Sequence, residues 1–213
     1  MTRHHPEGTS LMEFSAGTLS DPHALCIRLH LEKCPLCCSR VDTLESLGAV
    51  MLEQQPLNEL SEPAALIFDA ILARIDSDTV LLEAPRRRQD LIKKLLGCDI
   101  NDLPWKRQLG DVSMLDVTDR FPGQTERVVL QKLSSGGKAP AHTHRGTETT
   151  IVLQGAFSDQ NGIFNQWDFA VLDESDNHRP VAVGHEDCIT LSVLSAPLKL
   201  TGAFTRLLNP FMS

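Results

Sequence analysis

The stretch GGKAPAHTHRGTETTIVLQG, from Gly136 to Gly155, decides the fold of this chain. It contains two histidines two positions apart, His142 and His144, followed by Glu148. In an extended strand, residues two apart point to the same face, so both imidazoles should enter one interior while the carboxylate arrives from the adjoining turn or strand. Two imidazoles and a carboxylate form a donor set suited to zinc, manganese or iron. We therefore expect a metal site inside a β-structure.

Short runs of β-branched and apolar residues, separated by Gly, Pro and Asp, surround this stretch from about Asp99 onward. Such runs are typical of strands in an antiparallel barrel or a double-sheet sandwich. The runs are Arg127–Leu133, Thr147–Phe157, Asp168–Asp173 and Cys188–Phe204. The spacing G-x5-H-x-H-x3-E-x6-G resembles the first signature of the cupin fold. We expect an all-β cupin domain, a double-stranded β-helix or jelly roll, over residues 99–213.

The second cupin signature is matched only in part. In NQWDFAVLDESDNHRPVAV, residues 165–183, Trp167 stands where a Gly usually precedes Asp168, and the usual P-x-G is absent. The segment NHRPV nevertheless resembles the His-x-Pro that closes many cupin sites. This resemblance makes His178 the expected fourth ligand, with His185 as the fallback.

The first 83 residues carry apolar residues at helical spacing instead. Helices are expected near 8–17, over 22–33, from Pro35 to about Met51, and within 61–75. The apolar stripes expected to face inward are Leu36, Val41, Leu44, Leu47 and Met51 in the third helix and Leu66, Ile67, Ala70 and Ile71 in the fourth. We predict a small all-α bundle over residues 1–83, followed by a linker over residues 84–98 whose basic composition suits a short amphipathic helix.

The segment HLEKCPLC places three potential soft-metal ligands, His30, Cys34 and Cys37, where the second and third predicted helices meet. Tetrahedral zinc requires a fourth ligand, and helix N-terminal amides help to keep thiolates ionised. We expect the fourth ligand from His5 or His4 beside the opening helix, with His5 preferred. Poorer candidates, which would have to turn out of their helical faces, are Cys26 and Cys38. A redox pair or two packed thiols is the alternative interpretation of CPLC.

The net charge of −8 lies entirely in the first part of the chain. Residues 1–83 contain 5 Lys plus Arg against 13 Asp plus Glu, whereas residues 84–213 contain 15 of each. Nucleic-acid phosphates repel such an acidic module and basic protein surfaces attract it, so we expect no direct nucleic-acid binding.

No apolar run reaches the roughly 18 residues of a membrane helix, and the N-terminus lacks the apolar segment of a signal peptide. We therefore expect a cytoplasmic protein with no membrane contact. In that compartment the 6 cysteines are expected to be thiols or metal ligands, because the cytosol keeps thiols reduced.

The segments RHH, SAGTLSD and HLEKCPLC, followed by a single cupin, resemble the ChrR-type anti-sigma factors over nearly the whole chain. The resemblance implies a transcription regulator and not an enzyme, whose helical domain binds and inhibits an extracytoplasmic-function sigma factor. It also implies a cupin domain involved in sensing oxidative stress, by singlet oxygen or peroxide, and in releasing the sigma factor. One zinc in each domain is implied, although manganese or iron would also suit the cupin. The implied ligands are His5, His30, Cys34 and Cys37 in the first domain and His142, His144, Glu148 and His178 in the second.

Two other classes of function stay open at this point. Two histidines and a glutamate can hold iron(II) with positions open to substrate and oxygen, so a metal-dependent cupin dioxygenase or isomerase with an N-terminal assembly domain is the main alternative. A redox or zinc-storage protein that uses CPLCC is the third. For the regulator, a small-molecule oxidant would act at the cupin metal or on Cys188.

Overall fold

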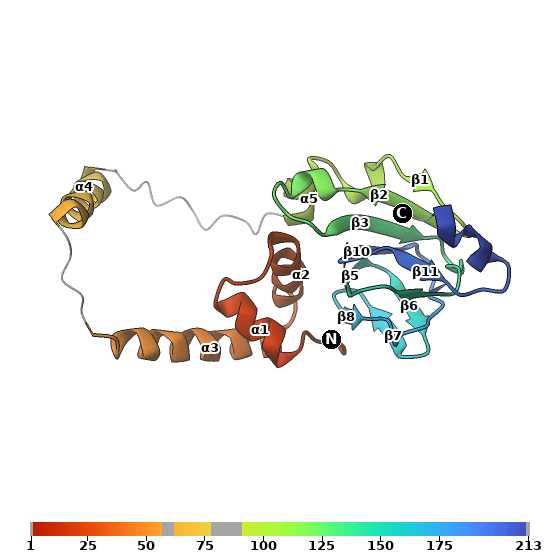
Figure 1. The fold of residues 1–213 in the computed structure, drawn as a ribbon, viewed down its shortest axis with the longest axis horizontal. Coiled ribbons are helices and arrows are strands. Elements are labelled where there is room, and N and C mark those ends of the chain that lie inside the picture. The colour runs from red at the N-terminus through yellow and green to blue at the C-terminus, as the bar shows by residue number, and fades with distance from the viewer. Residues whose placement is uncertain (1, 57–61, 78–90, 212–213) are drawn as a thin grey trace.

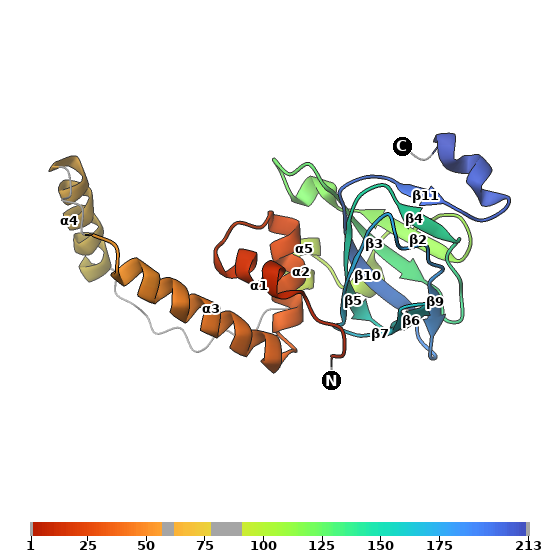
Figure 2. The ribbon, with the colours of Figure 1, turned by 60° about the horizontal axis from the view of Figure 1, so that its bottom comes forward.

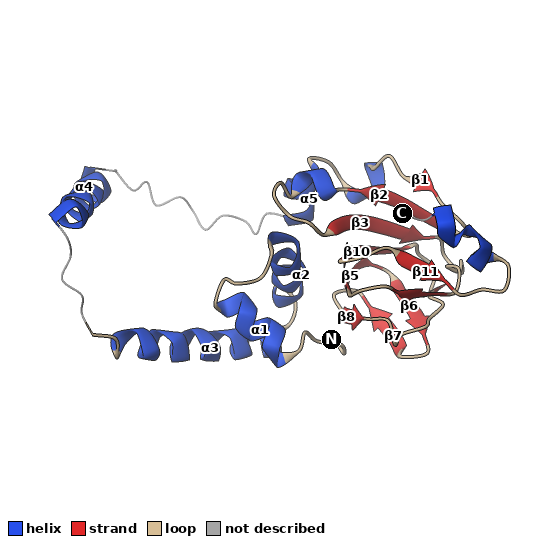
Figure 3. Cartoon of the chain, viewed as in Figure 1, coloured by secondary structure: helices blue, strands red, loops and turns tan. Residues whose placement is uncertain are grey.

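The computed structural model describes residues 2–56, 62–77 and 91–211, and it separates a helical part from a β-structure (Figure 1). The helices are α1 (Gly8–Ser15), α2 (Asp21–Leu31), α3 (Pro35–Glu53), α4 (Glu62–Ser77) and α5 (Leu91–Leu96), with 3-10 turns η1 (Ile100–Asp102), η2 (Thr118–Arg120) and η3 (Thr205–Phe211). The strands are β1 (Lys106–Arg107), β2 (Val112–Asp116), β3 (Arg127–Leu133), β4 (His142–His144), β5 (Glu148–Gln154), β6 (Ala156–Asp159), β7 (Gly162–Asn165), β8 (Phe169–Leu172), β9 (Val181–Val183), β10 (Cys188–Leu194) and β11 (Leu198–Leu200). Figure 3 shows the change from helices to strands along the chain. The expected order of an all-α part followed by an all-β part is confirmed.

The strands form three antiparallel groups that close around an interior. The largest sheet has the order β1-β2-β3-β10-β5-β8, and the smaller groups are β7-β6-β9 and β11-β4. The strand β4 pairs with β11, and an isolated bridge joins His142 to His178. The apolar part of the interior is made by Leu133, Val152, Phe157, Phe164, Ala170, Ala182 and Cys188. This arrangement is the expected cupin barrel.

The central strands β5 and β10 are buried on both faces. Their inward side chains include Thr150 and Ser192, whereas Ile151 and Leu191 point outward from the barrel. The helix α2 lies against this outer face (Figure 2). Its Ile27 joins Ile151 and Leu191 in one apolar core. The helical part and the barrel therefore share a core, and the continuous burial of β5 follows from cover on both sides.

The expectation that the apolar stripes of α3 and α4 face inward is wrong. Only the start of α3 is buried, through Cys37 and Val41, and α4 lies away from the barrel at the far end of the molecule (Figures 1 and 2). Large apolar side chains expected to face inward are exposed instead, namely Leu36 50%, Leu47 55%, Met51 58%, Ile67 61% and Ile71 49%. Leu44 is partly buried, and the side chain of Leu66 lies outside the described residues. Helical periodicity here marks an apolar face that no described part of this chain covers.

The predicted linker over residues 84–98 falls partly outside the described residues. Its described part forms α5, which buries Ile92 and Leu96 in the core shared by the helices and the sheet. Among the helices that the structure describes, none is both long and apolar enough to cross a membrane.

Candidate metal centres

The first cluster lies where the N-terminal segment meets the junction of α2 and α3. It contains His5, His30, Cys34 and Cys37, whose ligand atoms all lie within 4.8 Å of one another. The Nδ1 atom of His5 lies 3.3 Å from His30 Nε2, 3.3 Å from Cys34 Sγ and 3.5 Å from Cys37 Sγ. Pro35 starts α3, so the two cysteines occupy its N-cap and its first turn. The structure thus brings together the four residues expected from the sequence.

The other residues considered for this cluster point elsewhere. The His4 ring stacks on Phe164 at 4.1 Å between ring centroids, and its Nε2 lies 3.1 Å from the Ile163 carbonyl. Cys26 is fully buried in the core, and Cys38 donates its thiol proton to the Leu31 carbonyl at 2.9 Å. The choice between His4 and His5 therefore follows from the direction of each ring.

The two thiols of this cluster have opposite tendencies to ionise. Burial opposes ionisation of Cys34, but hydrogen bonds from Thr2 and from residues of the first turn of α3 outweigh it and lower the pKa of Cys34. Burial, the hydrogen bond to Cys34 and the negative charge there raise the pKa of Cys37 to about 12. A divalent cation between the sulfurs removes this conflict by attracting both thiolates. The two imidazoles and two thiols fit tetrahedral zinc.

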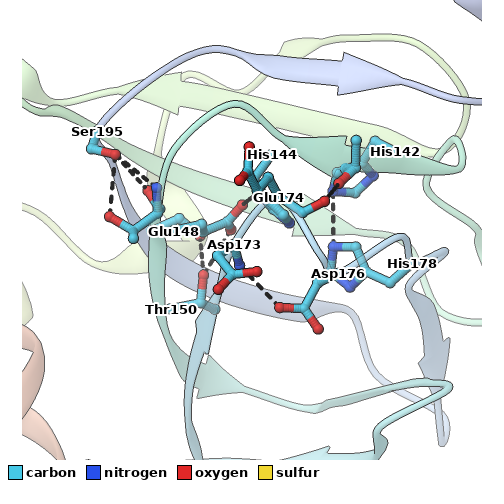
Figure 4. Close-up of polar contacts among 12 residues, drawn as sticks. His142, His144, Glu148, Thr150, Asp173, Glu174, Asp176, His178 and Ser195 are labelled. Atoms are coloured by element: carbon cyan, nitrogen blue, oxygen red, sulfur yellow. Dashed lines mark hydrogen bonds and ion pairs between the residues drawn. The ribbon is translucent and has the colours of Figure 1, made fainter.

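The second cluster lies inside the barrel, on the strand β4 and on the loop before β9. His142, His144 and His178 are 8%, 3% and 4% exposed, and their ligand atoms lie within 4.8 Å of one another. The Nε2 atoms of His142 and His178 are 2.9 Å apart (Figure 4). Burial and the neighbouring His178 lower the pKa of His142 to about 4, and burial also lowers the pKa of His144. Both rings are therefore neutral near pH 7, which is the form that binds a metal.

Glu148 lies beside this triad at the start of β5. Thr150 donates to its Oε1 at 2.8 Å, while its Oε2 lies 3.3 Å from His144 Nδ1 without forming a hydrogen bond (Figure 4). Among described residues, the buried side-chain atoms that lack a partner are Glu148 Oε2 and both ring nitrogens of His144. Unpaired buried polar atoms are costly, and these belong to His144 of the triad and to the neighbouring Glu148. The donor set thus fits a metal ion, with Glu148 at the edge of the triad.

Two outer contacts orient the rings of this triad, and neither was expected from the sequence. Asp159 Oδ2 lies 2.8 Å from His178 Nδ1, and the Pro140 carbonyl accepts from His142 Nδ1 at 2.8 Å. Contacts of this kind direct the opposite ring nitrogen toward a metal. Asp159 is 19 positions from His178, so no local sequence pattern links the two. The fallback ligand, His185, is exposed and lies outside the triad.

A small cavity of about 60 Å³ adjoins the triad inside the barrel. Its walls are mainly apolar, and they include His142, His178, Phe157 and Cys188. Burial, with a smaller effect of Glu186, raises the pKa of the Cys188 thiol to about 12. The thiol is therefore protonated, which makes Cys188 a poor nucleophile.

The fold and its two clusters define a cupin protein with an N-terminal helical part that carries a His2Cys2 cluster. Residues 93–197 match the ChrR cupin-like domain family. The chain is 32% identical to the anti-sigma-E factor ChrR of Cereibacter sphaeroides, over 98% of this chain and 97% of that protein. It is also similar to the crystal structure of Rhodobacter sphaeroides SigE in complex with the anti-sigma ChrR, with TM-score 0.77, 30% identity, and coverage of 92% of this chain and 100% of that chain. The chain therefore belongs to the ChrR family of anti-sigma factors.

Proposed function

We propose that this protein is a cytoplasmic anti-sigma factor, and not an enzyme, that binds an extracytoplasmic-function sigma factor through its helical domain and thereby inhibits it. The observation that carries the proposal is the likeness of nearly the whole chain to a protein named as an anti-sigma factor and to that protein's structure in complex with SigE. We assign the binding role to a helical domain over residues 1–83 and the sensing role to a cupin domain over residues 99–213, with residues 84–98 between them.

The exposed apolar faces of α3 and α4 support this proposal as the docking surface for the sigma factor. A run of large apolar side chains without cover is uncommon in an isolated soluble chain and is typical of a protein interface. The described members are Leu47, Val50, Met51 and Leu52 on α3, and Ile67, Phe68, Ile71 and Leu72 on α4. The acidic charge of the first 83 residues would speed the encounter with a basic partner, and it opposes direct contact with nucleic acid.

Zinc is the metal we propose for the first cluster, with His5, His30, Cys34 and Cys37 as ligands. For the cupin we propose a second zinc held by His142, His144, His178 and Glu148, a donor set that also suits manganese or iron. Each ion would supply a positive charge that binds neutral imidazoles and negatively charged thiolates or a carboxylate.

We further propose that the cupin metal is where a small-molecule oxidant acts to release the sigma factor. The cavity beside the triad supports this role because it offers space for a small molecule next to His142 and His178. The protonated state of Cys188 favours the metal over this thiol as the site of action.

The test of binding is co-expression of the full chain with each extracytoplasmic-function sigma factor of its genome, followed by size-exclusion chromatography and affinity measurement. One sigma factor should co-elute. The double variant Ile67→Ala and Ile71→Ala should weaken that complex roughly tenfold or more, because each truncated side chain loses apolar burial in the interface. Alanine keeps the helix, so the loss reports the contact.

The matched control is Ile163→Ala on β7, since Ile163 is 49% exposed, as is Ile71, but lies on the barrel. It should bind as the unmodified chain does. Failure of every sigma factor to co-elute would refute the proposed function. Equal binding by the double variant and the control would refute the docking surface alone.

A further inference from the structure

One turn of the cupin lies against the cluster of the helical part. The Trp167 carbonyl is 2.8 Å from Nδ1 of His30, a residue with no exposed surface. Because a carbonyl oxygen can only accept, the proton of the His30 ring must lie on Nδ1. The lone pair of Nε2 is therefore free and directed toward His5 Nδ1, 3.3 Å away. The cupin thus sets the ring state that a metal requires of His30.

The same turn holds the backbone just before His5. Asp168 has no exposed surface, and its Oδ1 accepts from the backbone N–H groups of Arg3 at 2.6 Å and His4 at 3.2 Å. The N–H of Phe169 donates to the His4 carbonyl at 3.1 Å, which pairs this segment with the start of β8. The residue that precedes His5 is thus held by both a carboxylate and a strand.

The backbone of the turn is held in an unusual conformation. Trp167 has φ +72°, and within the described ranges it is the one residue other than glycine with positive φ. Such a conformation costs on the order of 1–3 kcal/mol and persists when its surroundings determine it. Here the Trp167 N–H donates to the Val152 carbonyl at 2.8 Å, and Asp168 Oδ2 accepts from the Asn165 N–H at 2.8 Å. These contacts aim the Trp167 carbonyl at His30.

We propose that Asp168 is a positioning residue for the N-terminal metal cluster, which it serves by orienting the Arg3–His4 backbone and the Trp167 carbonyl. The cupin thereby sets the metal affinity of the helical part. This inference rests on the proposed function, in that His5, His30, Cys34 and Cys37 hold a metal. By linkage, occupancy of the cluster in turn stabilises the cupin turn.

Cobalt(II) titration of the metal-free full chain tests this proposal. Thiolate ligands give cobalt a near-ultraviolet charge-transfer absorption, and the cupin triad contains no thiol, so this absorption reports the N-terminal cluster alone. Asp168→Asn should lower the cobalt affinity of this cluster about 10- to 100-fold, the usual effect of losing an outer partner. The introduced amide N–H2 would also face a backbone N–H donor.

The matched control is Asp159→Asn, another buried cupin carboxylate, which contacts His178 of the triad instead. It should leave the thiolate absorption titration unchanged. A second variant, Arg3→Pro, deletes one N–H donor to Asp168 without altering the cupin, and it should weaken the cluster in the same direction.

The outcomes separate the two proposals. Absence of the thiolate absorption in the unmodified chain would overturn the metal site itself. Normal absorption with equal affinity in Asp168→Asn would overturn the positioning role while leaving the metal site intact. An equal loss in Asp159→Asn would show general destabilisation and would also overturn it. If Asp168→Asn does not fold, unchanged affinity in Arg3→Pro decides against the proposal.

Discussion

Cys34 and Cys37 are three positions apart at the start of α3, and this spacing brings both sulfurs to within 3.5 Å of His5 Nδ1. The thiolates gain from the helix N-terminus, but the raised pKa of Cys37 shows that the protein alone does not stabilise both charges. Binding of a metal is then coupled to the folding of this junction, because the ligands come from three separate segments.

The double variant Cys34→Ser and Cys37→Ser should therefore lose one bound metal per chain and lose sigma-factor binding. Its free energy of unfolding should fall by about 3 kcal/mol or more when zinc exceeds roughly 100 times its Kd. Elemental analysis and denaturant unfolding provide the measurements. The control is Cys38→Ser, since serine can keep the hydrogen bond to the Leu31 carbonyl. A double variant that kept its full metal content would contradict the assignment.

The element that connects the two parts of the molecule is β5. Its inward face carries Glu148 and Thr150 next to the triad, while its outward Ile151 packs in the core that contains Ile27 of α2. A single strand therefore contributes to the metal site and to the support of the helices. An edge strand such as β8 has no comparable cover on Val171, which is 47% exposed.

Ile151→Ala should lower the free energy of unfolding by about 2–5 kcal/mol, because it opens a cavity between α2 and the sheet. Val171→Ala on the neighbouring strand should change it by roughly 0.5 kcal/mol or less. Urea unfolding followed by circular dichroism measures both. Equal effects of the two substitutions would contradict the shared core.

At the scale of the whole molecule, the proposed sensing site and the proposed docking surface lie at opposite ends. The cavity beside the triad is inside the barrel. The helices α3 and α4, whose exposed apolar side chains form the proposed docking surface, extend away from the barrel (Figure 2). Between them lie β5, α2 and the turn at Trp167, all in direct contact. A change at the cupin metal would therefore have a packed route to the helices.

If the cupin metal is the site of action, His142→Ala should bind the sigma factor normally but fail to release it when a small hydroperoxide is added. Cys188→Ala should release it as the unmodified chain does, because burial keeps that thiol protonated. Release is measured by size-exclusion chromatography of the complex with and without oxidant. Normal release by both variants would remove both sites from consideration.

The ligand spacings and the strand runs could be predicted because they are local. His30, Cys34 and Cys37 lie within eight positions, and the alternation of His142 and His144 follows from strand geometry alone. The outer partners Asp159 and Asp168 could not be predicted in the same way. They contact residues 19 and more than 160 positions away, so only chain folding brings them together.

The sequence by itself determined the order of an all-α part and an all-β part and six candidate ligands, because periodicity and ligand spacing are properties of neighbouring residues. These ligands are His30, Cys34, Cys37, His142, His144 and Glu148. Tertiary structure decided which histidine turns to the cysteines, since His4 stacks on Phe164 of the barrel and leaves His5 for the cluster. It also decided that the apolar faces of α3 and α4 stay open. A helical stripe specifies a face that favours burial, but whether this chain or another covers it depends on where the distant elements lie.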